Sequence, residues 1–248
     1  MARSLSLARR FSLAYLALAA IFGGAVGTFV VLEERPAPTP PPPWSAWKPT
    51  EKDAVARLGE IAQHVEAQYH LPGGKKLVDV LPRGPAAPEP IAEVGIAKTP
   101  NPRQASDFSF SHADSTAMFI LCGDGPKCSI KEGKPSLARG AVLRREALEL
   151  ALYTLRYVDG ADSVVAFYPP QKGKDPTYAF YFAKSDFSNE LHAPLRQTLP
   201  HPKLPVPEKL TSGELKTVNA LTTQREFRFA VQTDQSGARV LLLARATG

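Results

Sequence analysis

The 248-residue chain has two cysteines, Cys122 and Cys128, and lacks the short motifs that usually mark an active site. A nucleophile elbow G-x-S-x-G, a phosphate-binding G-x-x-x-x-G-K-[ST], a dinucleotide-binding G-x-G-x-x-G and a metalloprotease H-E-x-x-H are all absent from the sequence. Without these motifs, no enzyme class is indicated, and we expect no cofactor and no metal.

A run of basic residues with interleaved aromatics is also lacking, although the formal net charge is +6. Three of the 30 Lys and Arg residues, Arg3, Arg9 and Arg10, precede residue 11, which leaves 27 basic against 24 acidic residues in the rest of the chain. So small an excess is not the electrostatic footprint of a nucleic-acid-binding protein. We therefore expect no nucleic acid among the partners.

Residues 11–32, FSLAYLALAAIFGGAVGTFVVL, contain no charged side chain. An apolar run of about 20 residues is long enough for a helix to cross the hydrocarbon core of a membrane. The flanking residues are ARR before the run and EER after it, so the positive-inside rule predicts a cytoplasmic tail at 1–10, a single-pass lipid-contacting anchor at 11–32 and an extracytoplasmic chain beyond. A cleaved signal peptide is the alternative, because Ala25-Val26-Gly27 fits a cleavage site, and it also carries the body of the protein across the membrane.

Residues 33–49 form a proline-rich linker. Proline fixes φ and removes the amide donor, so we expect an extended spacer that lifts the following domain away from the membrane. Trp44 and Trp47 could lie at the membrane interface or pack on the domain, and the sequence does not choose between them. Gly23 and Gly27 make one G-x-x-x-G pair, but small residues are frequent in membrane helices anyway, so the oligomeric state stays open.

Residues 50–248 are predicted to form one α+β domain of antiparallel hairpins packed with two main helices. The first helix is expected to begin at a Thr50–Asp53 capping box, and the second, at 137–157, carries an apolar arc that should pack on the sheet. Strand patterns occupy 75–81, the neighbourhood of Val94, 115–122, 128–132, 162–168, 176–183, 225–234 and 238–246.

The second predicted helix also has a charged side, with Arg145, Glu149 and Arg156 on it and Glu146 beside them. Such spacing usually gives ion pairs on a solvated helix face, and we expect the two glutamates to pair with the two arginines there. No two of the acidic residues stand out as a carboxylate pair for glycoside cleavage.

Three further patterns suggest chemistry but are better explained by structure. Ser111, His112, Asp114 and Ser115 superficially resemble a catalytic triad, yet neighbours on one strand point to opposite faces, which favours a polar strand entry. YAFYFA at 178–183 is interpreted as a central strand covered by the second helix rather than an exposed aromatic platform for glycan or peptide. The histidines show no metal-ligand spacing and are expected to be solvated or locally bonded: His64, His70, His112, His192 and His201.

Cys122 and Cys128 are separated by Gly-Asp-Gly-Pro-Lys. A redox pair normally has the tighter C-x-x-C spacing, and a structural zinc site needs two more ligands, for which no second cysteine pair exists. An extracytoplasmic location permits disulfides, so we expect Cys122 and Cys128 to be bridged at the tip of a hairpin that spans Met118 to Ile130.

The leading hypothesis is a non-enzymatic, membrane-anchored interaction module that contacts another envelope protein outside the cytoplasm. The alternative is an anchored envelope hydrolase acting on wall glycan or peptide through scattered carboxylates or His112. A concave pocket that gathers acidic residues or His112 would favour the enzyme.

Overall fold

The computed structural model describes residues 42–70, 74–84, 90–131, 136–200 and 210–246, together with Leu18 and Ala20. Apart from those two residues, the predicted tail and anchor and most of the linker lie outside this part of the chain. Among the described residues, no helix is long and apolar enough to cross a membrane. Contacts divide the chain into two compact units, 1–42 and 43–248, and the second unit holds every element named below.

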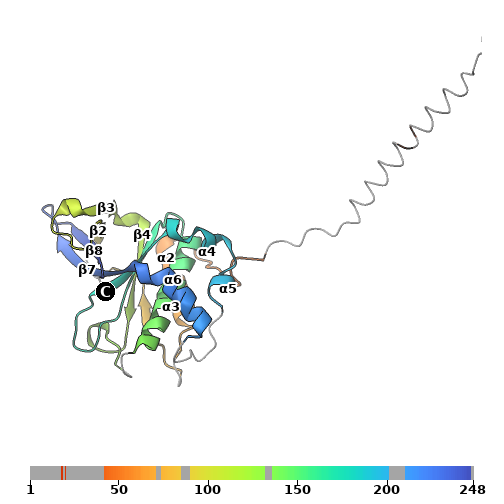
Figure 1. The fold of residues 1–248 in the computed structure, drawn as a ribbon, viewed down its shortest axis with the longest axis horizontal. Helices are drawn as coiled ribbons and strands as arrows, with labels where there is room; N and C mark the ends of the chain where they lie inside the picture. Colours follow the sequence, from red (N-terminus) through yellow and green to blue (C-terminus); the bar gives the residue numbers. More distant parts are fainter. Residues whose placement is uncertain are drawn as a thin grey trace, which may run out of the picture. The chain divides into compact units, whose positions relative to one another are not determined.

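An eight-stranded mixed sheet forms the centre of the second unit, in the order β1-β4-β5-β6-β7-β8-β2-β3 (Figure 1). The strands are β1 (Asp79–Leu81), β2 (Ile91–Ala97), β3 (Phe108–His112), β4 (Thr116–Cys122), β5 (Ser163–Phe167), β6 (Tyr178–Ala183), β7 (Glu226–Thr233) and β8 (Arg239–Arg245). The hairpins β5–β6 and β7–β8 are antiparallel, as predicted.

The prediction of a purely antiparallel sheet is wrong, because β4 runs parallel to β5 and β2 runs parallel to β8. No strand returns from β4 either: Pro126–Cys128 is a short 3₁₀ turn, and β4 pairs with β1 and β5 instead. A long helix connects β4 to β5, and a helical crossover brings the chain back to the sheet in the parallel direction. The β4 hairpin expected from Met118 to Ile130 is therefore absent.

The described residues form five α-helices: α2 (Ala54–Glu66), α3 (Leu137–Tyr157), α4 (Ser188–His192), α5 (Leu195–Thr198) and α6 (Ser212–Thr222). The prediction of α3 is confirmed over its full range, whereas α6 is an additional helix. α2 begins later than expected, since Asp53 is its N-cap and accepts from the Ala56 amide at 2.9 Å. The amide of Thr50 donates instead to the Glu60 carboxylate.

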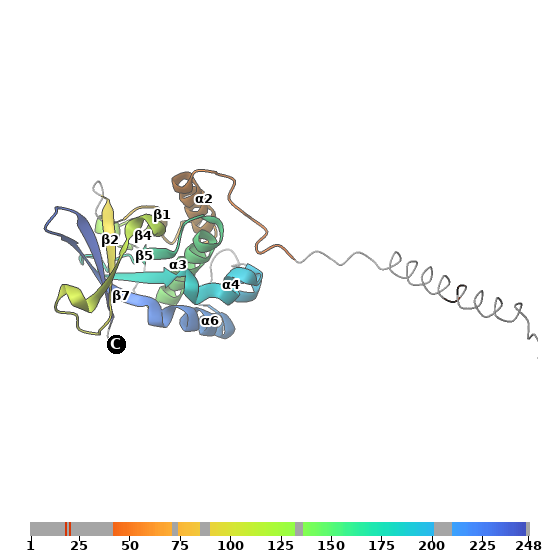
Figure 2. The same ribbon diagram turned by 90° about the horizontal axis from the view of Figure 1, so that it is seen from above.

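One face of the sheet packs against the helices along β4, β5 and β6 (Figures 1 and 2). Alternate strand residues supply this core: Ala117, Phe119, Leu121, Val164, Ala166, Phe180 and Phe182. α3 is its centre, and all residues from Ala141 to Leu155 except Arg144 are buried. A helix covered on every side must be enclosed by other elements, and here α2 and α6 contact α3 on the side away from the sheet.

On the opposite face, the two halves of the sheet pack against each other and not against helices. The core cluster on this face joins side chains from both halves of the sheet: Ile91, Val94, Met118, Val165, Phe167, Ala179, Phe227, Leu241 and Leu243. None of these residues belongs to a helix, so the sheet must curl for its two halves to bury one another. Figure 2 shows the half with β2 and β7 turning across the half with β4 and β5.

Trp44 and Trp47 pack on the domain, which decides the question that the sequence leaves open. The Trp44 indole lies edge-on to Tyr153 and Tyr157 and donates to the Glu190 carbonyl at 2.8 Å. Trp47 stacks on His64 with ring centroids 3.7 Å apart. The chain is therefore fixed to α3 from Trp44 onward.

The central place of α3 predicts a large difference between two leucines of the same helix. Leu148 is fully buried, whereas Leu137 is 95% exposed. Leu148→Ala should lower the free energy of unfolding by about 2–5 kcal/mol because it leaves a cavity, and Leu137→Ala should change it by less than about 0.5 kcal/mol. Denaturant unfolding of both variants measures this, and equal effects would contradict the packing described here.

Candidate functional site

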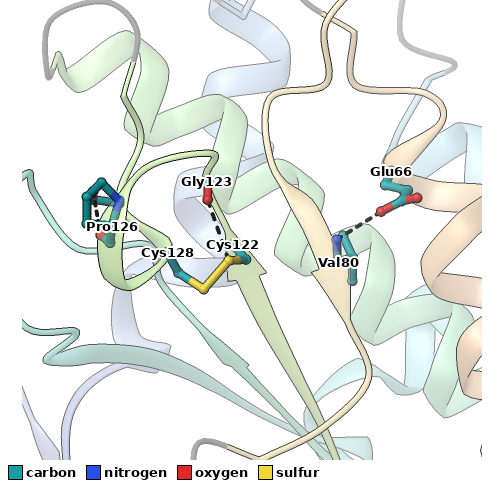
Figure 3. Close-up of a disulfide and its surroundings, with 7 residues drawn as sticks. Glu66, Val80, Cys122, Gly123, Pro126 and Cys128 are labelled. Carbon is teal, nitrogen blue, oxygen red and sulfur yellow. Dashed lines mark hydrogen bonds between the residues drawn. A yellow bond between two sulfur atoms is a disulfide. The ribbon is translucent and has the colours of Figure 1, made fainter.

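The structure joins Cys122 and Cys128 in a disulfide at the end of β4 (Figure 3). The loop between them turns back tightly: the Gly123 amide donates to the Cys128 carbonyl at 2.9 Å, and the Gly125 amide donates to the Ser129 carbonyl at 2.7 Å. A Cβ added at Gly123 would lie 2.5 Å from the Ser129 oxygen, so this approach requires glycine. The bridge therefore closes a compact loop rather than a β-hairpin tip.

A hollow of about 230 Å³ lies beside this loop. Its lining is Lys75, Lys76, Leu77, Val78, Asp79, Cys122, Asp124 and Ile130. Lys76 already pairs with Asp79 and with Glu66, at 3.4 and 2.7 Å, and Asp124 accepts from the Lys131 amide. Since these charges are engaged locally and His112 is on another strand, the hollow does not meet the criterion for a hydrolase pocket.

The remaining residues singled out in the sequence do not assemble into a site. His112 is exposed on β3, and no described hydrogen bond joins it to Ser111, Asp114 or Ser115. His70 and His192 bond to nearby carbonyls, of Gly74 and Ser188, and His201 lies outside the described residues. In the described part of the chain, no three His, Cys, Asp or Glu residues are grouped as metal ligands.

The aromatic strand β6 is central, as predicted. Phe180 and Phe182 are buried in the core that α3 covers, and Tyr181 packs in the second core on the other face. Tyr178 alone is more than a third exposed, at one end. The strand therefore serves packing and offers no aromatic platform.

The charged residues of α3 contradict the prediction of a solvated helix face. Arg145, Glu146 and Glu149 are all buried, and of the four residues only Arg156 is exposed. The helical wheel predicts one packed side, but α2 and α6 cover the other side as well. The two glutamates thus lie inside the domain, between helices.

Arg145 is the hub of a buried polar cluster. Its guanidinium donates to Glu149 at 2.9 Å and to Glu214 of α6 at 2.6 Å, and also to the Tyr69 hydroxyl and the Pro200 carbonyl. Burial disfavours its charge, but Tyr69, Glu149 and Glu214 outweigh that cost and hold the pKa of Arg145 above its ordinary value. Tyr69 in turn donates to Glu149 at 2.6 Å. The cluster ties α3 to α6 and to the segments that follow α2 and α5.

Glu146 lies near this cluster without joining it. Its side chain is fully buried, and neither carboxyl oxygen has a hydrogen-bond partner. Burial raises the pKa of Glu146 well above its usual range, and the nearby Glu149 and Glu66 raise it further. Both causes favour the protonated form of this buried carboxyl. A carboxyl pair in unlike environments can serve acid–base catalysis, but these groups are enclosed among helices, which favours a role in stability.

The helices cover only half of their face of the sheet. On β7, β8, β2 and β3 the same face carries three cross-strand rows that belong to neither core cluster. The rows are Arg228–Ala244–Ala97–Phe108, Ala230–Leu242–Gly95–Phe110 and Gln232–Val240–Glu93–His112. We call these twelve residues the outer face. It is mostly apolar at its centre and charged or polar at three of its four corners, and no helix is seen over it in Figures 1 and 2.

Phe110 is the most prominent side chain of the outer face. It is 44% exposed, and its ring covers Gly95, where an added Cβ would lie 2.7 Å from it and 2.9 Å from Leu242. A glycine in a strand often marks the close approach of another group. Here that group is the Phe110 ring, which occupies the space that a side chain at position 95 would need. The alternation of Phe and Ser in FSFSH is the sequence signal for this strand. The polar residues on either side make that signal difficult to recognise.

The two edges of the sheet differ sharply. At the β1 edge, Glu66 accepts from the Val80 amide at 2.9 Å, so a side chain of α2 occupies the edge (Figure 3). At the other edge, β3 pairs only with β2, and no described group bonds to the outward side of residues 109–112. We call this unpaired side the β3 edge.

Comparison with known proteins finds no family model, curated protein or solved structure that matches the chain.

The disulfide should matter for stability but only locally. In the chain-entropy model a bridge that closes so short a loop contributes about 2 kcal/mol, so Cys122→Ala/Cys128→Ala should lower the free energy of unfolding by about that amount. Denaturant unfolding measures the change. Maleimide should label the intact protein only after reduction, and labelling without reductant would contradict the bridge.

The buried Glu146 predicts a pH-dependent gain from an apolar substitute. The unfolded chain releases this proton above about pH 4.5, whereas the raised pKa of Glu146 lets the folded state retain it to a higher pH, so this group makes the wild-type protein less stable as the pH rises. Glu146→Met removes that loss, and its stability relative to wild type should therefore rise by about 1–3 kcal/mol between pH 4 and pH 7. Denaturant unfolding at both pH values is the measurement.

The control for this prediction is Glu51→Met, at an exposed glutamate. It should change stability by less than about 0.5 kcal/mol at either pH. If Glu146→Met shifted the unfolding free energy equally at pH 4 and pH 7, the buried carboxyl would not be the source of the pH dependence.

Proposed function

We propose that the protein is a membrane-anchored interaction module of the cell envelope, whose extracytoplasmic domain docks another envelope protein on the outer face. The single observation that carries this proposal is the half of a sheet face that no described helix covers, on which Phe110 and Ala230 are exposed and Leu242 is partly exposed, although Ala97 and Val240 are buried. Soluble domains rarely leave a contiguous apolar area uncovered unless something binds to it.

The composition of the outer face supports docking of a protein. Leu242, Phe110 and the small residues between them make a flat apolar centre, and Arg228, Gln232 and His112 supply polar groups around it. An apolar centre with a polar rim is the usual anatomy of a protein–protein interface, and aromatic and Arg residues are enriched there. The hollow beside the disulfide contains none of these residues.

The proposed location rests on the sequence. The uncharged run at 11–32, with basic residues before it and acidic ones after it, supports an anchor that leaves the domain outside the cytoplasm. A disulfide between Cys122 and Cys128 is compatible with that compartment, since bridges persist there. Trp44, packed on α3, would then fix the last part of the linker to the domain.

The alternative of an anchored wall hydrolase has less support. His112 is exposed, and no described hydrogen bond joins it to Glu93, its cross-strand neighbour on β2. Glu146 and Glu149 are enclosed among helices. The hollow beside the disulfide holds Asp79 and Asp124, but Asp79 is paired with Lys76. The binding module is therefore the better proposal.

Photo-cross-linking in native membranes tests the proposal. A photoreactive residue at Ala230, exposed on the outer face, should capture one specific envelope protein, whereas the same residue at Val55 of α2, 70% exposed, should not. Ala244→Glu, in the neighbouring row, should reduce the capture by burying a charge in the interface. Equal capture from both positions, or none from Ala230, would contradict docking on this face.

A further inference from the structure

We propose that two copies of the chain pair through their β3 edges, antiparallel and centred on Phe110, so that two sheets join into one. This inference goes beyond the proposed function, because it concerns the edge of the sheet rather than the outer face, and either could be true without the other. An unpaired strand presents main-chain donors and acceptors that another strand can bind.

The β3 edge lacks the features that normally prevent such pairing. Natural edge strands carry lysine, proline or a bulge, or another element covers them. β3 reads Phe-Ser-Phe-Ser-His, with none of those residues, and its register with β2 is regular. By contrast, β1 at the opposite edge has three residues and a donor already bonded to Glu66. The domain thus protects one edge and leaves the other open.

The β3 sequence is complementary to itself. An antiparallel pair centred on Phe110 places the two Phe110 residues opposite each other, Phe108 opposite His112, and Ser109 opposite Ser111. Phe108, Phe110 and His112 all lie on the outer face, so six rings from two copies form one aromatic strip. Aromatic cross-strand pairs are among the more stabilising pairs in sheets, and the serines can exchange hydrogen bonds on the other face. Closed twofold contacts of this kind need self-complementary surfaces.

The paired segment is limited to the strand itself. Ala105–Asp107 and Ala113–Ser115 on either side of β3 are 3₁₀ turns, so extended pairing covers Phe108–His112 alone. Within those five residues His112 lies opposite Phe108, so no two like charges meet along the edge. The symmetry of Phe-Ser-Phe-Ser-His about Phe110 is what favours a second copy over an arbitrary extended segment.

Cysteine cross-linking of the full-length chain in membranes tests the register. The native cysteines are bridged to each other, so added ones report alone. Phe110→Cys should give a dimer with a short bifunctional thiol reagent, since directly opposite Cβ atoms are about 5 Å apart. Val55→Cys, on α2, should remain monomeric. Mixed copies of Ser109→Cys and Ser111→Cys, each with its own tag, should cross-link to one another more than either does to itself.

In the second part of the experiment, charges are introduced at positions 109 and 111 of the Phe110→Cys variant. Ser109→Lys/Ser111→Lys puts like charges opposite each other twice, and should reduce the cross-linked fraction of Phe110→Cys by about tenfold. Ser109→Lys/Ser111→Glu puts opposite charges there and should restore it. Thermal unfolding of each variant verifies that the fold is retained.

The outcomes separate this inference from the proposed function. A chain that stays monomeric with Phe110→Cys and with the mixed 109 and 111 copies overturns the inference, as does cross-linking that the charges do not alter. If the edge fails while Ala230 still captures an envelope protein, the docking proposal stands without the dimer. If the β3 edges pair and Ala230 captures no envelope protein, the dimer inference stands and the docking proposal fails.

Discussion

The guanidinium of Arg145 joins parts of the chain that lie far apart in the sequence. From α3 it reaches Tyr69 beyond the end of α2, Glu214 on α6 and the carbonyl of Pro200. Arginine suits this position because its planar group offers five donors and keeps its charge when buried. Removal of one partner from such a buried pair costs about 3–5 kcal/mol, since the remaining charge is left uncompensated. The helix layer over the sheet depends on this contact.

That layer determines which surfaces the sheet leaves free. The helices cover β4, β5 and β6, and the curl of the sheet buries its second face without them. What remains is the outer face on β7, β8, β2 and β3 and the β3 edge. Both surfaces are left free because the helix layer is narrower than the sheet. Both lie on the same half of the domain, and in our proposals this half binds the partners.

Elements with a strong local pattern could be predicted from the sequence. The range of α3 agrees with its apolar periodicity, and the β5–β6 and β7–β8 hairpins agree with their alternation and turns. The strand β3 is harder, because FSFSH is short and flanked by polar residues. The charged side of α3 was expected in solvent because a helical wheel shows what one helix presents, and not how many neighbours cover it.

The sequence by itself determined the elements whose cause is local: α3, the hairpins, and the pairing of Cys122 with Cys128 six residues later. Only the tertiary structure decided that β4 and β5 run parallel, that β2 lies beside β8, and that Arg145 and Glu146 are buried. The physical reason is distance along the chain. Periodicity and turn chemistry act between near neighbours, whereas strand partners and burial depend on residues that only the fold brings together.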